Sequence, residues 1–327
     1  MQAQQVSMWL VDEEDGGQRL DNFLMRRLKG VPKTHIYRII RSGEVRINKG
    51  RASADRRVAA GDQIRVPPVR TSQAADARAL ALQSGAGFAP AREFPVLFED
   101  DQLLAIDKPA GTAVHGGSGV SFGVIEQLRM ARPQARTLEL VHRLDRETSG
   151  ILLVAKKRSA LKNLQEQFRD RVTGKTYLAL VAGVWPQRLK VLDKPLHKYL
   201  LPDGERRVAV VDKQHPDAMA ALSLVQVARV AGGYSLLEVT IKTGRTHQIR
   251  VHLADQGMPI LGDDKYGNFE LNKSLQRAGT SVALRRMFLH AWRLQFRHPA
   301  SGEPIVLQAE LPPELVLFLD HAIASLA

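Results

Sequence analysis

The sequence contains no cysteine among its 327 residues. This absence excludes a disulfide framework, thiolate catalysis, iron–sulfur clusters and any zinc site that uses cysteine. A chain of this length buries enough apolar surface to fold without such cross-links. Long apolar runs are also missing, since the segment from Tyr177 to Trp185 is far shorter than the ~20 residues of a membrane helix. The segment from Met1 to Asp15 lacks the apolar core of a signal peptide, so we expect a cytoplasmic protein without a membrane partner.

Acidic residues are scarce in one particular segment. The whole chain carries 47 Lys and Arg against 34 Asp and Glu, a formal charge of +13. Between Arg19 and Arg70 there are fourteen basic residues against four acidic ones, so this segment holds most of the excess. A dense excess of one sign on a small domain repels itself and is best neutralised by a polyanion. The charge pattern therefore indicates a nucleic acid or an acidic membrane surface as partner.

The basic segment also has the apolar pattern of a small αβ domain. Leu20, Phe23, Leu24 and Leu28 share one face of a predicted helix. A second helix is predicted from Thr34, as its N-cap, to the glycine at position 43. Short strands are predicted over residues 44–47 and 63–66, with a turn at residues 48–50.

Over residues 16–70 this arrangement resembles the S4 RNA-binding module. Modules of this kind contact the shape and the phosphates of structured RNA. The resemblance makes three arginines candidate RNA contacts: Arg19, Arg38 and Arg41. The Ala-rich composition of residues 71–92 predicts a linker, in which residues 74–82 are compatible with a helix. We therefore expect an S4-like domain over residues 1–70 and a second domain over residues 93–327.

In the second domain, predicted strands outnumber helices. Residues 237–241 alternate between apolar and polar side chains, and residues 151–155 form a uniformly apolar run. Strands are also predicted over residues 289–296 and 304–311, and βαβ units do not repeat regularly. The predicted fold class is therefore α+β, with a mixed, mainly antiparallel sheet.

Common metal and cofactor motifs are absent from the sequence. The Gly-rich residues 115–119 lack the spacing of a phosphate-binding loop, and no Gly-x-Ser-x-Gly elbow occurs. His247 and His252, five residues apart, project to different faces of either a helix or a strand, so they do not form a chelating pair. We therefore expect no metal and no cofactor.

One carboxylate stands in an unusual setting. Asp145 lies between Arg143 and Arg146, directly before a buried strand; taken alone, it is more often a structural residue. Three further segments join it: residues 175–177, residues 243–252 and residues 262–267. In the second of these, Thr246 is predicted to cap a helix that ends near Gly257. Together, residues 142–150 (HRLDRETSG), 175–177 (KTY) and 244–252 (GRTHQIRVH) resemble three motifs of the RluA-type family of RNA pseudouridine synthases. The likeness extends over about residues 94–313.

The resemblance implies a reaction that breaks the C1′–N1 bond of a uridine and joins C1′ to C5. It implies that Asp145 is the essential carboxylate, acting either as a nucleophile or as a base on the ribose. Tyr177 would stack on the target uracil, although a core tyrosine fits the strand pattern equally well. Arg245 would either form an ion pair that keeps Asp145 charged or bind a phosphate.

Three further residues receive roles from the same resemblance. Arg143 would fill the space that a flipped uridine leaves, since a guanidinium can stack in place of a base. His142 would be a further RNA contact, and Ile249 would form a wall of the pocket unless it is simply a core residue. The implied partner is 23S rRNA or a large-subunit assembly intermediate, with the chain acting as a monomer that needs no other protein.

Two other functions fit parts of the sequence. One is a non-catalytic, S4-bearing RNA-binding protein associated with the ribosome. The other is a metal-dependent nuclease that uses Asp145 with Asp263 and Asp264. The nuclease would require Mg²⁺ and cleave the RNA chain, whereas uridine isomerisation leaves the chain length unchanged.

Overall fold

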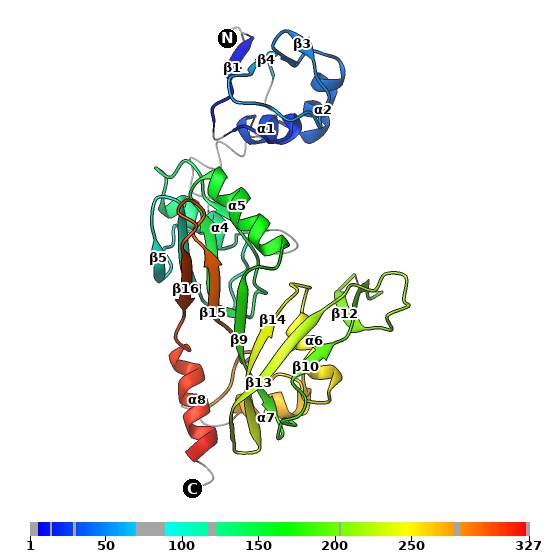
Figure 1. The fold of residues 1–327 in the computed structure, drawn as a ribbon, viewed down its shortest axis with the longest axis vertical. Helices are drawn as coiled ribbons and strands as arrows, with labels where there is room; N and C mark the ends of the chain where they lie inside the picture. Colours follow the sequence, from blue (N-terminus) through cyan, green and yellow to red (C-terminus); the bar gives the residue numbers. More distant parts are fainter. Residues whose placement is uncertain are drawn as a thin grey trace. The chain divides into compact units, whose positions relative to one another are not determined.

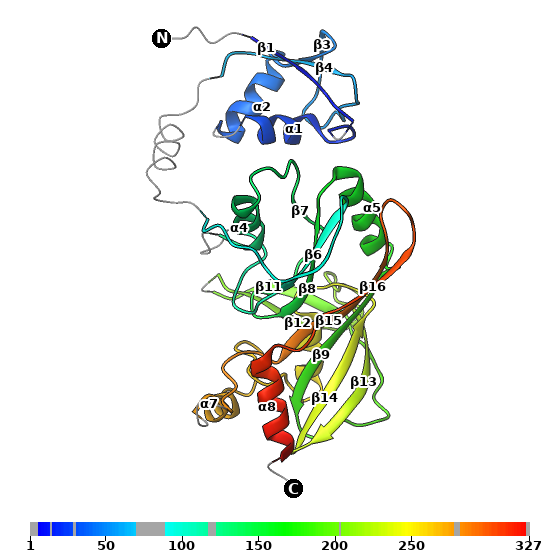
Figure 2. The same cartoon turned by 90° about the vertical axis from the view of Figure 1, so that its left-hand side faces the viewer.

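The computed structural model describes residues 6–13, 15–28, 31–69, 89–116, 122–202, 204–277 and 282–324. Backbone contacts divide the chain into two compact units, Met1–Phe88 and Ala89–Ala327 (Figure 1, Figure 2). The predicted helix over residues 74–82, and the predicted linker as far as residue 88, lie outside the described residues.

The first unit packs two helices on a small sheet. Its elements are β1 (Ser7–Leu10), α1 (Leu20–Arg27), α2 (Lys33–Arg41), β2 (Arg46–Ile47), β3 (Gly50–Arg51) and β4 (Gln63–Val66). The strand order is β1-β4-β2-β3. Leu20, Phe23 and Leu24 are buried in the core of this unit, which confirms the predicted apolar face of the first helix.

Two local predictions for the first unit have different outcomes. The turn at residues 48–50 is confirmed, because Asn48 and Lys49 have φ values of 50° and 69°, as a two-residue hairpin turn requires. The prediction of Thr34 as the N-cap is wrong. Pro32, whose ring holds φ at −57°, occupies that position and α2 begins at the next residue.

The second unit is built on one long sheet. Its strands are β5 (Val96–Glu99), β6 (Leu103–Lys108), β7 (Glu139–Leu140), β8 (Ser149–Ala155), β9 (Gly174–Ala182), β10 (Val191–Asp193), β11 (Leu196–Leu200), β12 (Arg206–Val210), β13 (Leu222–Ala231), β14 (Tyr234–Ile241), β15 (Leu289–Arg297) and β16 (Pro304–Gln308). Its helices are α4 (Val124–Ala131), α5 (Arg158–Arg169), α6 (Gln248–Asp255), α7 (Phe269–Arg277) and α8 (Pro313–Ala324).

The long sheet has the order β10-β13-β14-β9-β15-β8-β6-β5, with β16 paired to β15 and β7 paired to β8. Among the described strands, β15 and β8 are the one parallel pair, so the predicted mixed, mainly antiparallel α+β fold is confirmed. Strands β11 and β12 form a separate two-stranded sheet. No helix in the described part of the chain is both long enough and apolar enough to pass through a lipid bilayer.

Two helices cover opposite faces of the sheet at β6 and β8. Leu104 and Leu152 belong to the core that includes α4, whereas Leu103 and Leu153 belong to the core that includes α5. Successive side chains of a strand point to opposite faces, so α4 and α5 lie on different sides of these strands (Figure 2). Strand β8 is buried along its whole length, which explains its uniformly apolar sequence.

The parallel pairing of β8 with β15 is short and close. It joins His290 to Ser149 and Ala291 to Gly150. Gly150 has a φ of 109°, and a Cβ added there would lie 2.3 Å from the carbonyl oxygen of Ala291, so only glycine fits. The loop that precedes β8 therefore ends inside the sheet, next to β15, the strand that separates β8 from β9.

Candidate active site

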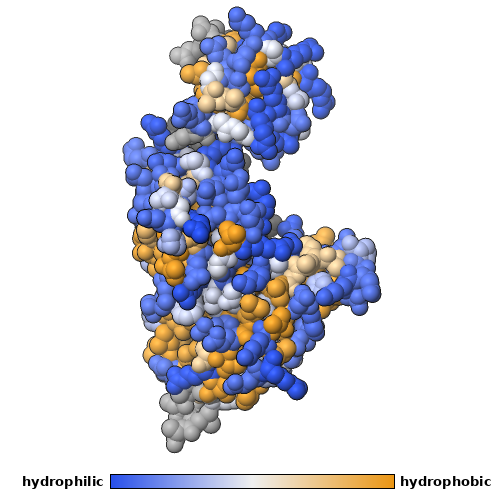
Figure 3. Space-filling view, in the orientation of Figure 1, coloured by the Kyte–Doolittle hydropathy of each residue, from blue (hydrophilic) through white to orange (hydrophobic). Residues whose placement is uncertain are grey.

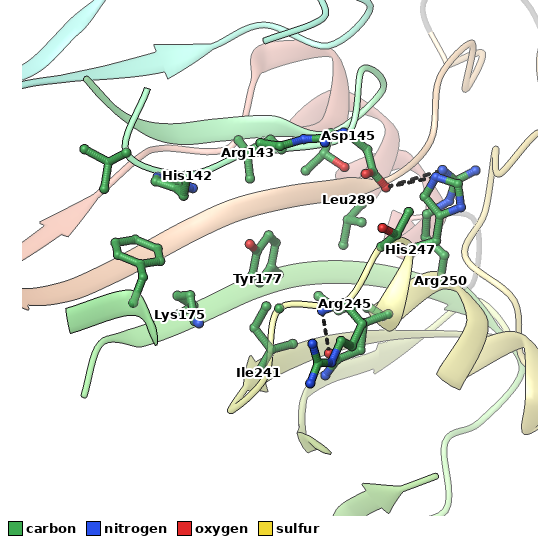
Figure 4. A pocket seen from close by; sticks show the side chains of 18 residues that line it. His142, Arg143, Asp145, Lys175, Tyr177, Ile241, Arg245, His247, Arg250 and Leu289 are labelled. Carbon is green, nitrogen blue, oxygen red and sulfur yellow. Dashed lines mark hydrogen bonds and ion pairs between the residues drawn. The ribbon is translucent and has the colours of Figure 1, made fainter. Parts of the chain in front are cut away.

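A cavity of about 460 Å³ opens where the loop between β7 and β8, strand β9 and the start of α6 meet (Figure 4). Each of the three sequence motifs supplies one of these segments. Figure 4 shows Asp145 on one side of the cavity and Tyr177 on the strand that faces it. The cavity is lined by these predicted residues among others: His142, Arg143, Asp145, Tyr177, Arg245 and Ile249.

The loop that carries Asp145 is anchored on both sides of this residue. Leu144 is buried in the core beneath α4. On the other side, Lys108 Nζ donates hydrogen bonds to the carbonyl oxygens of Arg146 at 3.1 Å, Pro109 at 2.9 Å and Thr112 at 2.8 Å. Burial lowers the pKa of Lys108 to about 7, and these carbonyl contacts satisfy its ammonium group. The Asp145 side chain therefore starts from a fixed backbone position.

A guanidinium and an imidazole face the Asp145 carboxylate. The Asp145 side chain is 29% exposed. Arg250 Nη1 lies 3.5 Å from Asp145 Oδ2, and His247 Nε2 lies 3.8 Å from the same oxygen. Within the described residues, Asp145 Oδ1 has no hydrogen-bond partner. One carboxylate oxygen is thus held by the protein and the other is available to a ligand in the cavity.

Arg250 is itself held rigidly. Its side chain is 4% exposed, and its Nε and Nη2 atoms each donate to one oxygen of Asp263 at 2.7 Å. Asp263 is fully buried and also accepts the backbone N–H groups of Lys265 and Tyr266. These bonds lower the pKa of Asp263 despite its burial, and a bidentate pair of this kind fixes the plane of the guanidinium. Arg250 therefore presents Nη1 to Asp145 in a constant orientation.

The tautomer of His247 follows from its hydrogen bonds. Tyr266 Oη accepts the Val208 N–H at 3.0 Å and lies 2.8 Å from His247 Nδ1. The hydroxyl proton is then free to be donated to Nδ1, which leaves the imidazole proton on Nε2, facing Asp145. Burial lowers the pKa of His247, so the ring is neutral at pH 7. Neutral His247 stabilises the carboxylate as a dipole rather than as a second cation.

The predicted ion pair between Arg245 and Asp145 is wrong, because Arg250 occupies that position. Arg245 Nε donates to the carbonyl oxygen of Ala220 at 3.1 Å, and its backbone N–H is bonded to Gln248 Oε1. Figure 4 shows the Arg245 guanidinium turned away from the carboxylate. Its other predicted role, phosphate binding, fits this half-buried position at the edge of the cavity.

The start of α6 explains which arginine enters the site. The predicted cap, Thr246, is off by one residue: His247 is the N-cap, with a left-handed φ of 53°. His247 and Arg250 are three residues apart and thus lie on the same side of the first turn. Sequence reasoning missed the roles of His247, Arg250, Asp263 and Tyr266, although the spacing of the first two was a usable signal.

The remaining predicted residues lie at different depths. Tyr177 is partly buried at the cavity. Desolvation and the charge of Asp145 raise the pKa of its hydroxyl, which makes no hydrogen bond within the described residues. Ile249 is buried in the core and also lines the cavity. Arg143 is exposed at the cavity and has no protein partner among the described residues.

His142 has a supporting position in the cavity wall. Its ring stacks on Phe168 with a centroid separation of 4.8 Å, and its Nε2 accepts the Leu153 N–H at 3.1 Å. Burial lowers the pKa of His142 to about 4, so the ring is neutral. The imidazole thus contacts both β8 and α5. These two contacts account for the position of His142, and its contact with RNA stays a prediction.

The geometry disfavours the metal-dependent nuclease. The Arg250 guanidinium contacts Asp145, Asp263 and Asp264, so a divalent cation bridging these carboxylates would meet a fixed positive charge. In the described part of the chain, one group of three potential metal ligands lies within 4.8 Å of one another: His197, His215 and Asp217. None of these three lines the cavity.

The predicted RNA contacts of the first unit differ in availability. Arg19 binds the buried carboxylate of Asp21 at 2.7 Å, so part of its charge is already compensated. Arg38 and Arg41 are exposed on the outer side of α2, as predicted, opposite the buried Ile36 and Ile39. Figure 3 shows a mainly hydrophilic surface over α2 and β3 in this view.

Together, a mixed sheet, a cavity with an Asp–Arg pair opposite a tyrosine, and an S4-type first unit define the class of RNA pseudouridine synthases. Comparison with known families agrees: the RNA pseudouridylate synthase profile matches residues 102–255, and the S4 domain profile matches residues 18–64. The chain belongs to the RNA pseudouridylate synthase family and carries an S4 domain.

Individual relatives cover nearly the whole chain. "Ribosomal large subunit pseudouridine synthase C" of Pasteurella multocida (strain Pm70) is 49% identical over 312 residues, which cover 95% of this chain and 92% of the relative. The protein of the same name from Escherichia coli (strain K12) is 48% identical over 307 residues, covering 94% and 93%. Among solved structures, "Human RNA Pseudouridylate Synthase Domain Containing 4" is similar at 30% identity and a TM-score of 0.57. It covers 70% of this chain and 93% of its own.

Proposed function

We propose that this chain converts specific uridines of 23S rRNA to pseudouridine, on naked RNA or on a large-subunit assembly intermediate. The names of the two bacterial relatives support this substrate, and the basic S4-type unit supports a structured RNA. The observation that carries the proposal is the open oxygen of Asp145, beside Arg250 and in one cavity with Tyr177. A binding protein without catalysis has no need for this arrangement.

The reaction is an isomerisation, so atoms and electrons balance without a co-reactant. The C1′–N1 bond of the uridine breaks, the uracil turns, and C5 forms a new bond to C1′. The proton of C5 is lost and N1 gains one. Asp145 Oδ1 either attacks C1′, which gives a transient ester, or removes a proton from the ribose. Both routes require a carboxylate, and Arg250 Nη1, 3.5 Å from Asp145 Oδ2, places a compensating positive charge beside it.

The other residues of the cavity prepare the nucleotide. The target uridine must leave its stack, at a cost of a few kcal/mol. Arg143, exposed and unpaired within the described residues, would fill the vacated space. The uracil would then stack on Tyr177, with Ile249 as a further wall, while Arg245 would bind a phosphate at the edge.

Asp145, Tyr177 and Arg250 line one cavity without a residue from a second chain, and we propose that the protein acts as a monomer without an obligatory protein partner. Outside the cavity, Arg38 and Arg41 would contact RNA phosphates, and Arg19 would contribute from its ion pair. These contacts hold the RNA while the uridine enters the cavity.

The test is to incubate the protein with unmodified 23S rRNA and to map pseudouridine by carbodiimide treatment and primer extension. We expect new stops at a few uridines and full-length RNA on a denaturing gel. RNA cleavage would favour a nuclease, and the absence of new stops would contradict the proposed function.

A further inference from the structure

One charged side chain of the same cavity has no part in the reaction described above. Lys175 is on β9, two residues before Tyr177, so both side chains leave the same face of the strand about 6.7 Å apart. Lys175 is 8% exposed and lines the cavity. In Figure 4 it lies on the side of Tyr177 away from Asp145.

Lys175 lacks an anionic partner. Its Nζ lies 5.4 Å from the centre of the Phe168 ring, and its ammonium makes no hydrogen bond or ion pair within the described residues. Other lysines of this unit are paired: Lys156 Nζ lies 2.8 Å from Glu99, and Lys194 Nζ lies 2.6 Å from Asp255. Exposed lysines such as Lys190 and Lys198 also lack a partner in the described residues, but water solvates their charge, whereas Lys175 is buried.

Two more cations act electrostatically on Lys175, although neither lines the cavity, and both lack a carboxylate partner in the described residues. Arg171 is exposed just before β9, and Lys242 is exposed just after β14, the strand paired with β9. Burial and the charges of these two residues lower the pKa of Lys175. A buried ammonium beside two like charges is unfavourable in the free protein unless a ligand supplies the negative charge.

The geometry points to a phosphate site: we propose that Lys175, with Arg171 and Lys242, binds a backbone phosphate next to the target uridine. Uracil is neutral, so a contact with the base alone leaves the three cations uncompensated. A phosphate held here fixes the nucleotide while its base lies on Tyr177 and its C1′ faces Asp145. Lys175 is then a positioning residue, and this inference rests on the proposed function.

Lys175→Met tests the site, with RNA binding and turnover measured separately. The probe is an unmodified 23S rRNA fragment that contains a uridine mapped with the wild-type protein. We expect the Kd and KM to rise roughly 10-fold, as for loss of one charge-assisted contact. The slope of log Kd against log salt should fall by about 0.7–0.9, the change for one phosphate contact. The single-turnover rate at saturating RNA should stay within about threefold of wild type.

Three further measurements separate this role from a structural one. Lys175→Arg should restore most of the affinity, because it restores the charge. The melting temperature of Lys175→Met should not fall, because methionine removes an unpaired buried charge. Lys156→Gln, which removes a lysine already paired with Glu99, should leave the Kd and the salt slope unchanged.

An unchanged salt slope in Lys175→Met would overturn the inference. A large loss of the saturated rate with an unchanged Kd would also overturn it, since that result assigns Lys175 to the base. If the wild-type protein modifies 23S rRNA, either result refutes only the phosphate site. If the wild-type protein forms no pseudouridine, the proposed function itself fails.

Discussion

Asp263→Asn tests how Arg250 is held in place. The pair is almost completely buried, with the two side chains 4% and 0% exposed. Breaking a buried ion pair from one side destabilises a protein by about 3–5 kcal/mol. The lower end applies here, because Arg250 keeps its contacts with Asp145 and Asp264. In a domain of this size, a loss of ~3 kcal/mol lowers the melting temperature by about 6–12 °C.

The assay is differential scanning calorimetry at pH 7, with Asp264→Asn as the matched control. Asp264 contacts the same Nη2 atom of Arg250 at 3.1 Å, but its side chain is 63% exposed. An exposed pair contributes at most about 1 kcal/mol, so this control should shift the melting temperature by no more than about 4 °C. Equal shifts in the two variants, or a larger shift in Asp264→Asn, would refute the reasoning.

Three further predictions concern the base, the pH and the S4-type unit. Tyr177→Ala should weaken binding of a target RNA fragment by about 1–3 kcal/mol, whereas Tyr177→Phe keeps the ring and should bind like wild type; equal losses would contradict stacking. Burial lowers the pKa values of His142 and His290 from 6.5 to about 4, so below pH 6.5 the unfolded chain binds protons that the folded unit does not. The melting temperature of the wild-type protein should therefore fall as the pH is lowered from 6.5 to 4. The fall should be less steep in His290→Gln, and an equally steep fall in this variant would contradict the lowered pKa of His290. Replacing Arg38 and Arg41 together with Gln should lower the salt slope of RNA binding by roughly 0.7–0.9 for each phosphate contact, and an unchanged slope would place the RNA elsewhere.

Much of the fold was predictable because alternation and helical spacing depend only on neighbouring residues. The apolar run in β8 and the face of α1 are examples, and both are buried as predicted. The three motifs also converge on one cavity, which includes Asp145 and Tyr177. These are features that short segments of sequence determine locally.

The identity of the arginine beside Asp145 was not predictable in this way. It depends on where α6 begins, and the left-handed His247 starts the helix one residue later than the predicted cap. Arg245 then precedes the helix and bonds to Ala220, while Arg250 faces the cavity. Its buried partner Asp263 is 13 residues farther along the chain. Local patterns do not reveal such a contact, because it forms only when the tertiary structure brings the segments together.

The central claim is that the carboxylate of residue 145 performs the chemistry. The most direct measurement compares Asp145→Asn with Glu147→Gln, a neighbouring acid that pairs with Arg146 at 2.7 Å. Both variants are incubated with unmodified 23S rRNA, and pseudouridine and RNA binding are measured in parallel. We predict that Asp145→Asn binds the RNA but forms no pseudouridine, while Glu147→Gln forms it at nearly the wild-type rate. Pseudouridine formation by Asp145→Asn at the rate of the control would contradict the claim.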